Sequence, residues 1–475
     1  MKKKKSMKKG SLILSMCILL TSVSAFPAVA NSAQMQWKGT DRTGSIITDE
    51  TCPVTVEREQ LTFDIQEFPE QYYRETDDYL AYSSRVTAEY IFYNPADYAV
   101  SAVLVFPFGR LPDYGILYDE AKGNQVLPVD TEKYNITVNG EEIQKTLRYT
   151  FAPFSREFDK ERDMDLLHQG YMEDEFYTPD MPVTRYTYVS SGVDTETWDA
   201  ANAAFIPAFD SSETRILMEN QNGLRAVENE VQLESWVHDE PFTVNVIGRP
   251  LKQMPEWKFY ENGACEKEIE GIMTLAGTEV LTLEEFALSE YQENSGILRH
   301  DWYNAVIEAM KYFEGPHGII DSSENPFESF EISRRLMRWY EYELVLEPGE
   351  RLKNTVTAPV YPSLNAAYEP PVCQYTYLLS PAQSWNSFGT LDIAVNTPYC
   401  MVDDSLGQFK QDESGFVCHL KGLPEGELTF TLCQEENPSK ASNRNTVTAA
   451  AVFLPLAAML VIGIAVFIWK KKRKE

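Results

Sequence analysis

The C-terminal end of the sequence restricts where this chain can reside. From Val447 to Trp469 it runs for 23 residues without a charge. As an α-helix this segment would be about 34 Å long, enough to cross a hydrocarbon core of about 30 Å. The next five residues are all cations: Lys470, Lys471, Lys472, Arg473 and Lys474. Because basic residues stay on the cytoplasmic side, we predict a single-pass membrane helix at 447–469, a cytoplasmic tail at 470–475, and everything before the helix outside the cell.

The first 30 residues have the three parts of a secretory signal. Six lysines among the first nine residues precede an apolar stretch, and the small residues Ala28 and Ala30 mark a cleavage site after Ala30. Together with the basic-tailed helix, this signal predicts a protein of the Gram-positive bacterial cell membrane. A wall-sorting signal would end in the same way, but the chain lacks its Leu-Pro-x-Thr-Gly motif. We therefore expect the helix to be retained as an anchor.

Between these two ends the chain is strongly acidic. Residues 31–446 carry 31 Lys and Arg against 71 Asp and Glu. A field of that sign repels nucleic acid, so nucleic-acid binding is excluded, and it favours solubility and cationic or divalent partners. The partners we expect are membrane lipid, reached through the C-terminal helix, and an envelope protein or polysaccharide.

Strand patterns fill most of the outer portion. Apolar and polar residues alternate over 54–65 and 85–93, and Asn139-Gly140 separates two β-prone runs, which indicates a hairpin. Strand patterns return over 178–248 and 342–432. The predicted fold class is mainly β with a helical segment, built from two or more β-sandwich domains plus one C-terminal transmembrane helix.

The period of apolar residues becomes helical between 282 and 340. Thr282 and Glu285 have the spacing of a capping box. Four-residue spacing then predicts an amphipathic helix through Leu298, Trp302, Val306 and Met310, ended by Gly315-Pro316. A second helix is indicated by Ile332, Leu336 and Tyr340 on one face.

These patterns predict a linear series of segments. The signal peptide at 1–30 is followed by an N-terminal β-sandwich at 31–155 and a second β-rich segment at 156–280. The helical segment at 281–340 leads to a membrane-proximal β-sandwich at 341–433. A polar stalk at 434–446 then connects the sandwich to the transmembrane helix.

Part of the mature chain resembles a group of bacterial proteins. The strings Glu59-Gln60-Leu61, Val86 to Asn94, Val105-Phe106-Pro107 and Val138-Asn139-Gly140 follow one another here. Their order is similar to that in uncharacterised exported, membrane-anchored bacterial proteins with an N-terminal β-sandwich domain of unknown function. The resemblance covers about the first third of the mature chain and implies a sandwich there, and it brings no catalytic residues.

No segment carries a recognisable catalytic motif. None of the five histidines stands in a nucleophile or metal-protease motif, and Cys418 and His419 are neighbours that would point to opposite faces of a strand. We therefore predict no catalytic residues and no cofactor, and interpret the chain as a surface protein with a binding or structural role. One alternative is a carboxylate-dependent hydrolase of wall or sugar polymers. Another is a subunit of a membrane receptor or envelope complex.

Two residue types remain candidates for local chemistry. Six cysteines follow the signal peptide, and four of them fall within 61 residues and are disulfide candidates: Cys373, Cys400, Cys418 and Cys433. Because Cys418 and Cys433 flank the turn at 424–426, we expect them to face each other on neighbouring strands. Acidic groups at 163–165, 173–175 and 403–404 are candidate Ca²⁺ ligands, although none has the EF-hand pattern.

Overall fold

The structure is a computed structural model that describes residues 28–30, 33–38, 52–68, 84–110, 117–119, 124–126, 135–153, 156, 158–198, 200–228 and 230–440. It is mainly β with several sheets and few helices, which confirms the predicted mainly-β class. Residues 447–469 lie outside the described residues. Within the described part, no helix has the length and apolar character needed to cross a membrane.

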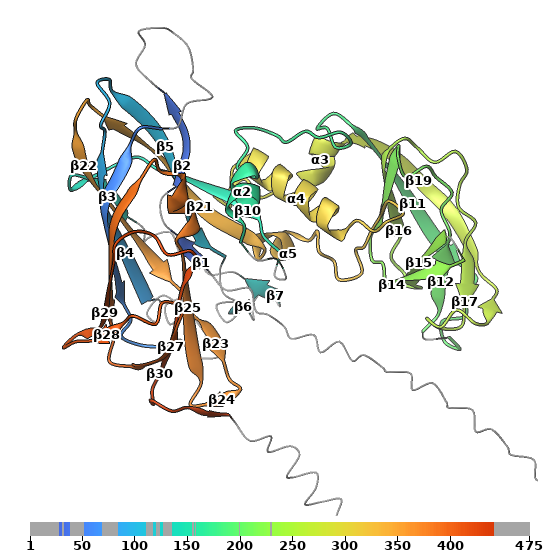
Figure 1. Cartoon of the computed structure of the whole chain (residues 1–475). Coiled ribbons are helices and arrows are strands. Elements are labelled where there is room, and N and C mark those ends of the chain that lie inside the picture. The colour runs from blue at the N-terminus through green and yellow to red at the C-terminus, as the bar shows by residue number, and fades with distance from the viewer. Residues whose placement is uncertain are drawn as a thin grey trace, which may run out of the picture.

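A large β-sandwich forms one end of the molecule (Figure 1). Its larger layer is an eight-stranded sheet in the order β28-β29-β26-β3-β4-β22-β8-β9. These strands are β3 (Thr55–Asp64), β4 (Ser84–Tyr93), β8 (Asn135–Val138), β9 (Glu141–Glu142), β22 (Arg351–Val360), β26 (Phe388–Asn396), β28 (Lys410–Gln411) and β29 (Gly415–Leu420). The turn of the predicted hairpin is confirmed, because Asn139 and Gly140 link β8 to β9 with φ of 51° and 90°. Its expected second arm, 143–151, is wrong: only Glu141 and Glu142 pair with β8, and residues 146–151 pair in another sheet.

Two smaller sheets pack against the eight-stranded one. One has the order β10-β21-β5-β2 and consists of β2 (Ala33–Lys38), β5 (Val100–Gly109), β10 (Thr146–Phe151) and β21 (Leu336–Leu346). The other has the order β1-β25-β30-β27, with β23 also on β25, and consists of β1 (Ala28–Ala30), β23 (Ser363–Asn365), β25 (Val372–Leu378), β27 (Cys400–Asp404) and β30 (Leu428–Cys433). Buried side chains from all three sheets form one continuous core.

That core joins segments that the sequence divided between two sandwiches. β3, from the expected N-terminal sandwich, pairs in parallel with β26, from the expected membrane-proximal one, with Leu61 opposite Ile393. The two segments are therefore halves of a single sandwich. Local alternation cannot reveal this pairing, because it connects residues more than 300 positions apart.

Several short elements border the sandwich. The predicted cleavage residues Ala28 and Ala30 lie in β1, parallel to β25, while residues 1–27 lie outside the described part. The expected stalk begins against the sandwich, since β31 (Ser439–Lys440) pairs with β24 (Tyr368–Glu369). The remaining elements are the pair β6 (Leu117–Asp119) and β7 (Asn124–Val126) and the 3-10 helix η2 (Ser380–Ser384).

An inserted domain occupies the chain between β10 and β21. These two strands are antiparallel neighbours, paired from Thr146 opposite Glu341 to Phe151 opposite Leu336. The backbone N–H of Ala152 donates to the carbonyl of Arg335 over 2.7 Å. The chain therefore leaves the sandwich and returns to it at the same point, and Figure 1 shows the inserted domain projecting to one side.

The inserted domain contains two sheets that share a core. The first has the order β19-β11-β16-β13-β20, from β11 (Pro182–Ser191), β13 (Thr214–Met218), β16 (Phe242–Gly248), β19 (Ile272–Thr282) and β20 (Ile319–Ile320). The second has the order β14-β15-β12-β17-β18, from β12 (Asn202–Phe205), β14 (Gly223–Val227), β15 (Glu230–Trp236), β17 (Lys258–Tyr260) and β18 (Glu268–Ile269).

Helices form a second core on the other face of the first sheet. They are α3 (Leu283–Ala287), α4 (Arg299–Phe313) and α5 (Ser329–Ser333). α2 (Lys160–Asp165) lies apart from this core, because its Met164 packs on a small cluster that contains Trp339 and Leu378 of the sandwich. The capping box of Thr282 and Glu285 begins α3, as predicted, and α4 buries Trp302, Val306 and Met310. The second predicted helix is wrong: only Ile332 lies in the short α5, whereas Leu336 and Tyr340 belong to β21. Residues 336–340 are all buried, and such a run also suits a central strand.

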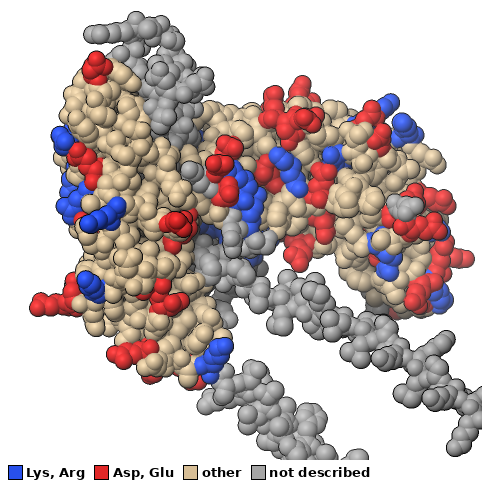
Figure 2. Space-filling view, viewed as in Figure 1, with Lys and Arg blue, Asp and Glu red and all other residues tan. Residues whose placement is uncertain are grey.

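Charge is divided unevenly between the two parts. Residues 152–335, which make up the inserted domain, hold 14 Lys and Arg against 37 Asp and Glu, a net charge of −23. Figure 2 shows acidic side chains gathered over this domain. On the eight-stranded sheet, Arg85 on β4 pairs with Asp64 on the neighbouring strand β3, and Arg351 on β22 reaches across β4 to Glu57 on β3.

Candidate functional site

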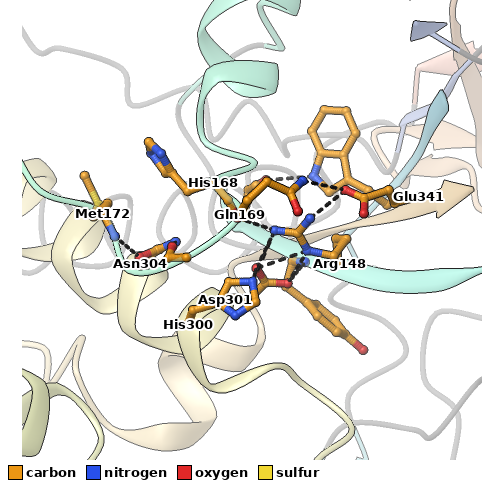
Figure 3. Close-up of polar contacts among 12 residues, drawn as sticks. Arg148, His168, Gln169, Met172, His300, Asp301, Asn304 and Glu341 are labelled. Atoms are coloured by element: carbon orange, nitrogen blue, oxygen red, sulfur yellow. Dashed lines mark hydrogen bonds and ion pairs between the residues drawn. The ribbon is translucent and has the colours of Figure 1, made fainter. Parts of the chain in front are cut away.

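A buried arginine joins the inserted domain to the sandwich (Figure 3). Arg148 on β10 is 2% exposed. Its Nε donates to both carboxylate oxygens of Asp301 over 3.3 and 3.1 Å, and its Nη2 donates to Oδ1 of Asp301 over 3.0 Å. Nη1 donates to Oε2 of Glu341 over 2.6 Å, and Nη2 also donates to the carbonyl of His168 over 2.5 Å. One guanidinium therefore connects β10, the first turn of α4, β21 and the segment after α2.

Asp301 is equally buried and equally well bonded. It is 2% exposed, and besides Arg148 it accepts the backbone N–H of Tyr149 over 3.0 Å. Burial alone lowers the pKa of Arg148, but hydrogen bonding and Coulomb attraction to Asp301, with a further contribution from Glu341, raise it above its ordinary value. The guanidinium of Arg148 is therefore held in its charged form.

The groups around this pair add further contacts to the junction. His300 places its Nε2 3.3 Å from Oδ1 of Asp301, and burial lowers the pKa of His168. Next to them, Asn304 on α4 accepts the N–H of Met172 over 2.7 Å and donates to the carbonyl of Gly170 over 3.0 Å. Each nitrogen of Arg148 already donates to the protein, so the cluster acts as a clamp that holds the inserted domain.

A pocket lies in the inserted domain, between the first sheet and α3 and α4. Its volume is 480 Å³, within the range of about 300–1,000 Å³ common for small-ligand sites. Its apolar lining includes Leu217, Phe286 and Val306. Its charged lining consists of Arg185, Glu219, Glu290 and Glu328. These residues come from β11, the end of β13, the end of α3, α4 and the loop before α5.

A row of polar side chains crosses the sheet into this pocket. Nη1 of Arg185 donates to Glu279 on the edge strand β19 over 3.3 Å, and its Nε donates to Oδ1 of Asn245 on β16 over 3.2 Å. Asn245 in turn donates through Nδ2 to Oε1 of Glu219 over 2.9 Å. The guanidinium is therefore held by its neighbours, and the pocket has three carboxylates against one engaged cation. Such a lining favours a cation with an apolar part.

Two further hollows lie on the sandwich. One, of 720 Å³, is lined by Arg58, Asp392, Lys410 and His419 on the outer face of the eight-stranded sheet. Asp392 contacts the ring of His419 and accepts from Nε of Arg58 over 3.1 Å, so both of its carboxylate oxygens have partners within the protein. The other hollow, of 820 Å³, lies beside the C-terminal end of β30 and is lined in part by Gln374, Asp403 and Glu436.

The sheet topology corrects one part of the cysteine prediction, the expected facing of Cys418 and Cys433. All six cysteines in the described residues are free thiols. Cys418 lies on β29 in the eight-stranded sheet and Cys433 on β30 in another sheet, so their expected pairing across neighbouring strands is wrong. Cys400 is the residue directly opposite Cys433. Cys373, beside them on β25, is buried, and burial raises its pKa to about 12.

The other sequence candidates have structural roles here. Cys418 is buried while His419 is exposed, as their opposite faces predicted. In the acidic groups considered for Ca²⁺, Asp163 accepts from Arg162, Asp174 from the backbone N–H of Tyr177, and Asp404 from that of Leu406. Over the described ranges, no three His, Cys, Asp or Glu side chains are grouped so as to hold a metal ion. The pocket residues, by contrast, had no signal in the sequence, because they come from short segments spread over positions 185 to 328.

Comparisons with known proteins assign no family to this chain and no role to the clamp or the pocket. No protein-family model and no curated protein matches the chain. Among solved structures, the crystal structure of a candidate nutrient binding protein from Legionella pneumophila has a TM-score of 0.32 and 7% sequence identity, covering 85% of this chain and 70% of that chain. A similarity at this level does not demonstrate a shared fold.

Proposed function

We propose that this protein is a membrane-anchored cell-surface protein that binds a small organic cation. The observation that carries this proposal is the 480 Å³ pocket, whose lining combines Glu219, Glu290 and Glu328 with apolar side chains. The C-terminal apolar segment supports the membrane anchor, and the preceding signal supports export. The sandwich then acts as the base, and the acidic inserted domain as the binding head.

The pocket's composition defines the class of ligand. An ammonium group gains Coulomb energy and charge-assisted hydrogen bonds from the three glutamates, and an adjoining apolar portion packs on Phe286, Leu217 and Val306. The net charge of −23 on the surrounding domain raises the local concentration of cations and repels anions. Primary amines such as diamines, basic amino acids and amino sugars fit this description.

The clamp at Arg148 supports this function by fixing the head to its base. A binding site needs its lining residues held in place before the ligand arrives. α4 contributes Asp301 to the clamp and Val306 to the pocket wall, so one helix is shared by both. The hydrolase and receptor-subunit alternatives stay predictions of the sequence.

Titration calorimetry on the full-length chain in detergent tests the proposal. Cadaverine, lysine and glucosamine are the cationic probes, and N-acetylglucosamine is the neutral counterpart of glucosamine. We expect binding of at least one amine and none of the neutral sugar. The double variant Glu290→Gln, Glu328→Gln should weaken amine binding at least tenfold, equivalent to about 1.4 kcal/mol.

The matched control is Glu256→Gln, which removes an exposed carboxylate of the same domain that does not line the pocket. It should leave amine affinity within a factor of two. Equal losses in the control and the double variant would mean that the amines respond only to overall charge. That result, or the absence of binding by every amine, would overturn the proposal.

A further inference from the structure

The inserted domain has an open sheet edge at β19. This strand runs for 11 residues and pairs with β11 on one side. On its other side it has no strand partner among the residues that the structure describes. Figure 1 shows it at the outer margin of the inserted domain, away from the sandwich. A long edge of this kind exposes backbone donors and acceptors that an added strand can use.

The side chains at this edge are unusually apolar for the surface of so acidic a domain. Nine large apolar side chains are exposed in the described part of the chain, and four of them lie on β19 and its neighbour: Val189, Ile272, Leu275 and Val280. Ile272 is 62% exposed and Val280 66%. β19 carries a single charge, Glu279, which is paired with Arg185.

Strand register places Leu275 and Val280 on one face of the first sheet. Leu275 lies opposite Tyr188 and Val280 opposite Thr184, and directly opposed residues project from the same face of a sheet. Tyr188 belongs to the core between the two sheets, so Leu275 and Val280 face the same side. Because they are exposed, the second sheet does not extend over them. An added strand would bring its own side chains to cover this strip.

The negative charge around β19 favours a basic partner over a second copy of this chain. Glu268 and Glu270 precede β19, and Glu284 and Glu285 follow it. A second copy of this chain would bring the same carboxylates and another −23 charge against them, which opposes self-association. A basic segment is attracted at both ends of the strand and alongside Glu279.

We propose that β19 is a docking edge for an extended basic segment of a partner protein, which adds as a strand. Backbone hydrogen bonds to β19 hold the segment. Its apolar side chains cover Leu275 and Val280, and its lysine or arginine side chains lie near Glu279 and the flanking glutamates. This surface is separate from the pocket, so the inference does not depend on the proposed amine binding.

Fluorescence anisotropy with synthetic peptides and the full-length chain in detergent tests the docking edge. The probe is a nine-residue peptide of alternating lysine and valine. One control has the same sequence with alternate backbone nitrogens methylated, which keeps its charge but removes hydrogen-bond donors. The other control replaces lysine with glutamate. We expect the first peptide to bind, the methylated one to bind at least tenfold more weakly, and the acidic one not to bind.

Paired protein variants locate the binding. Val280→Lys on β19 should weaken the lysine–valine peptide at least tenfold. Val345→Lys is the matched control, because Val345 is 54% exposed on β21, a strand with neighbours on both sides. It should leave affinity unchanged. Equal affinity of methylated and unmethylated peptides, or equal losses in both variants, would show adsorption to an acidic surface and overturn the proposal. So would a concentration-dependent dimer, measured by sedimentation, that Val280→Lys dissociates.

Discussion

Removing the guanidinium of Arg148 should release the inserted domain from the sandwich. Arg148→Met keeps much of the side chain's length but leaves Asp301, which is 2% exposed, and the carboxylate of Glu341 without their cation. Loss of one partner of a buried ion pair costs about 3–5 kcal/mol, because the remaining charge is desolvated and unpaired. We expect the free energy of unfolding of the inserted domain to fall by about that amount.

Urea denaturation followed by limited proteolysis measures this loss domain by domain. Arg58→Met is the matched control, because it removes an arginine from an ion pair with Asp392 in which the arginine side chain is 52% exposed. Exposed pairs of this kind contribute about 0–1 kcal/mol. The reasoning is refuted if Arg148→Met costs no more than Arg58→Met. A specific rescue is also expected: adding Asp301→Leu should recover part of the loss, because an apolar residue replaces the unpaired buried carboxylate.

Three further predictions follow from burial, close packing and the membrane segment. Burial raises the pKa of Cys373 to about 12, so in the folded protein at pH 8 only about one such thiol in ten thousand is ionised. Alkylation measured by mass spectrometry should therefore reach this thiol only after unfolding. Equally fast alkylation before and after unfolding would contradict this. Gly389→Ala should destabilise the sandwich by more than about 2 kcal/mol in thermal unfolding, because a Cβ there would lie 2.0 Å from the carbonyl oxygen of Glu57. As a control, Gly170→Ala should have little effect, because a Cβ at Gly170 meets nothing within 4 Å. A chain stopped after Thr446 should appear in the medium as a soluble protein, and its retention in the membrane fraction would indicate a second anchor.

Local patterns predicted local structure well. The capping box of Thr282 and Glu285 and the turn at Asn139-Gly140 depend on residues a few positions apart, and both are present. Leu336 and Tyr340 were misassigned because the buried strand β21 and an amphipathic helix both place apolar residues four positions apart. The parallel pairing of β3 with β26 has no local signature, so one sandwich was divided into two.

The candidate site was harder to predict from the sequence than the local structure. Arg185, Glu219 and Glu328 are brought together only when β11, β13 and the loop before α5 pack on α3 and α4. In a chain with 72 acidic residues, no two of these glutamates stand out. The clamp was hidden for a similar reason, since Arg148 and Asp301 are 153 positions apart and neither belongs to a motif.

The adjoining exits of β10 and β21 make the head a replaceable module. Phe151 and Leu336 are paired neighbours, so a two-residue turn in place of residues 152–335 would close the two strands into an ordinary hairpin. An ancestral sandwich would need only one insertion event, at one turn, to acquire such a domain, without reordering any strand of its own. The same position would accept a head of different specificity, and descendants of one base could diversify by exchanging what they carry there.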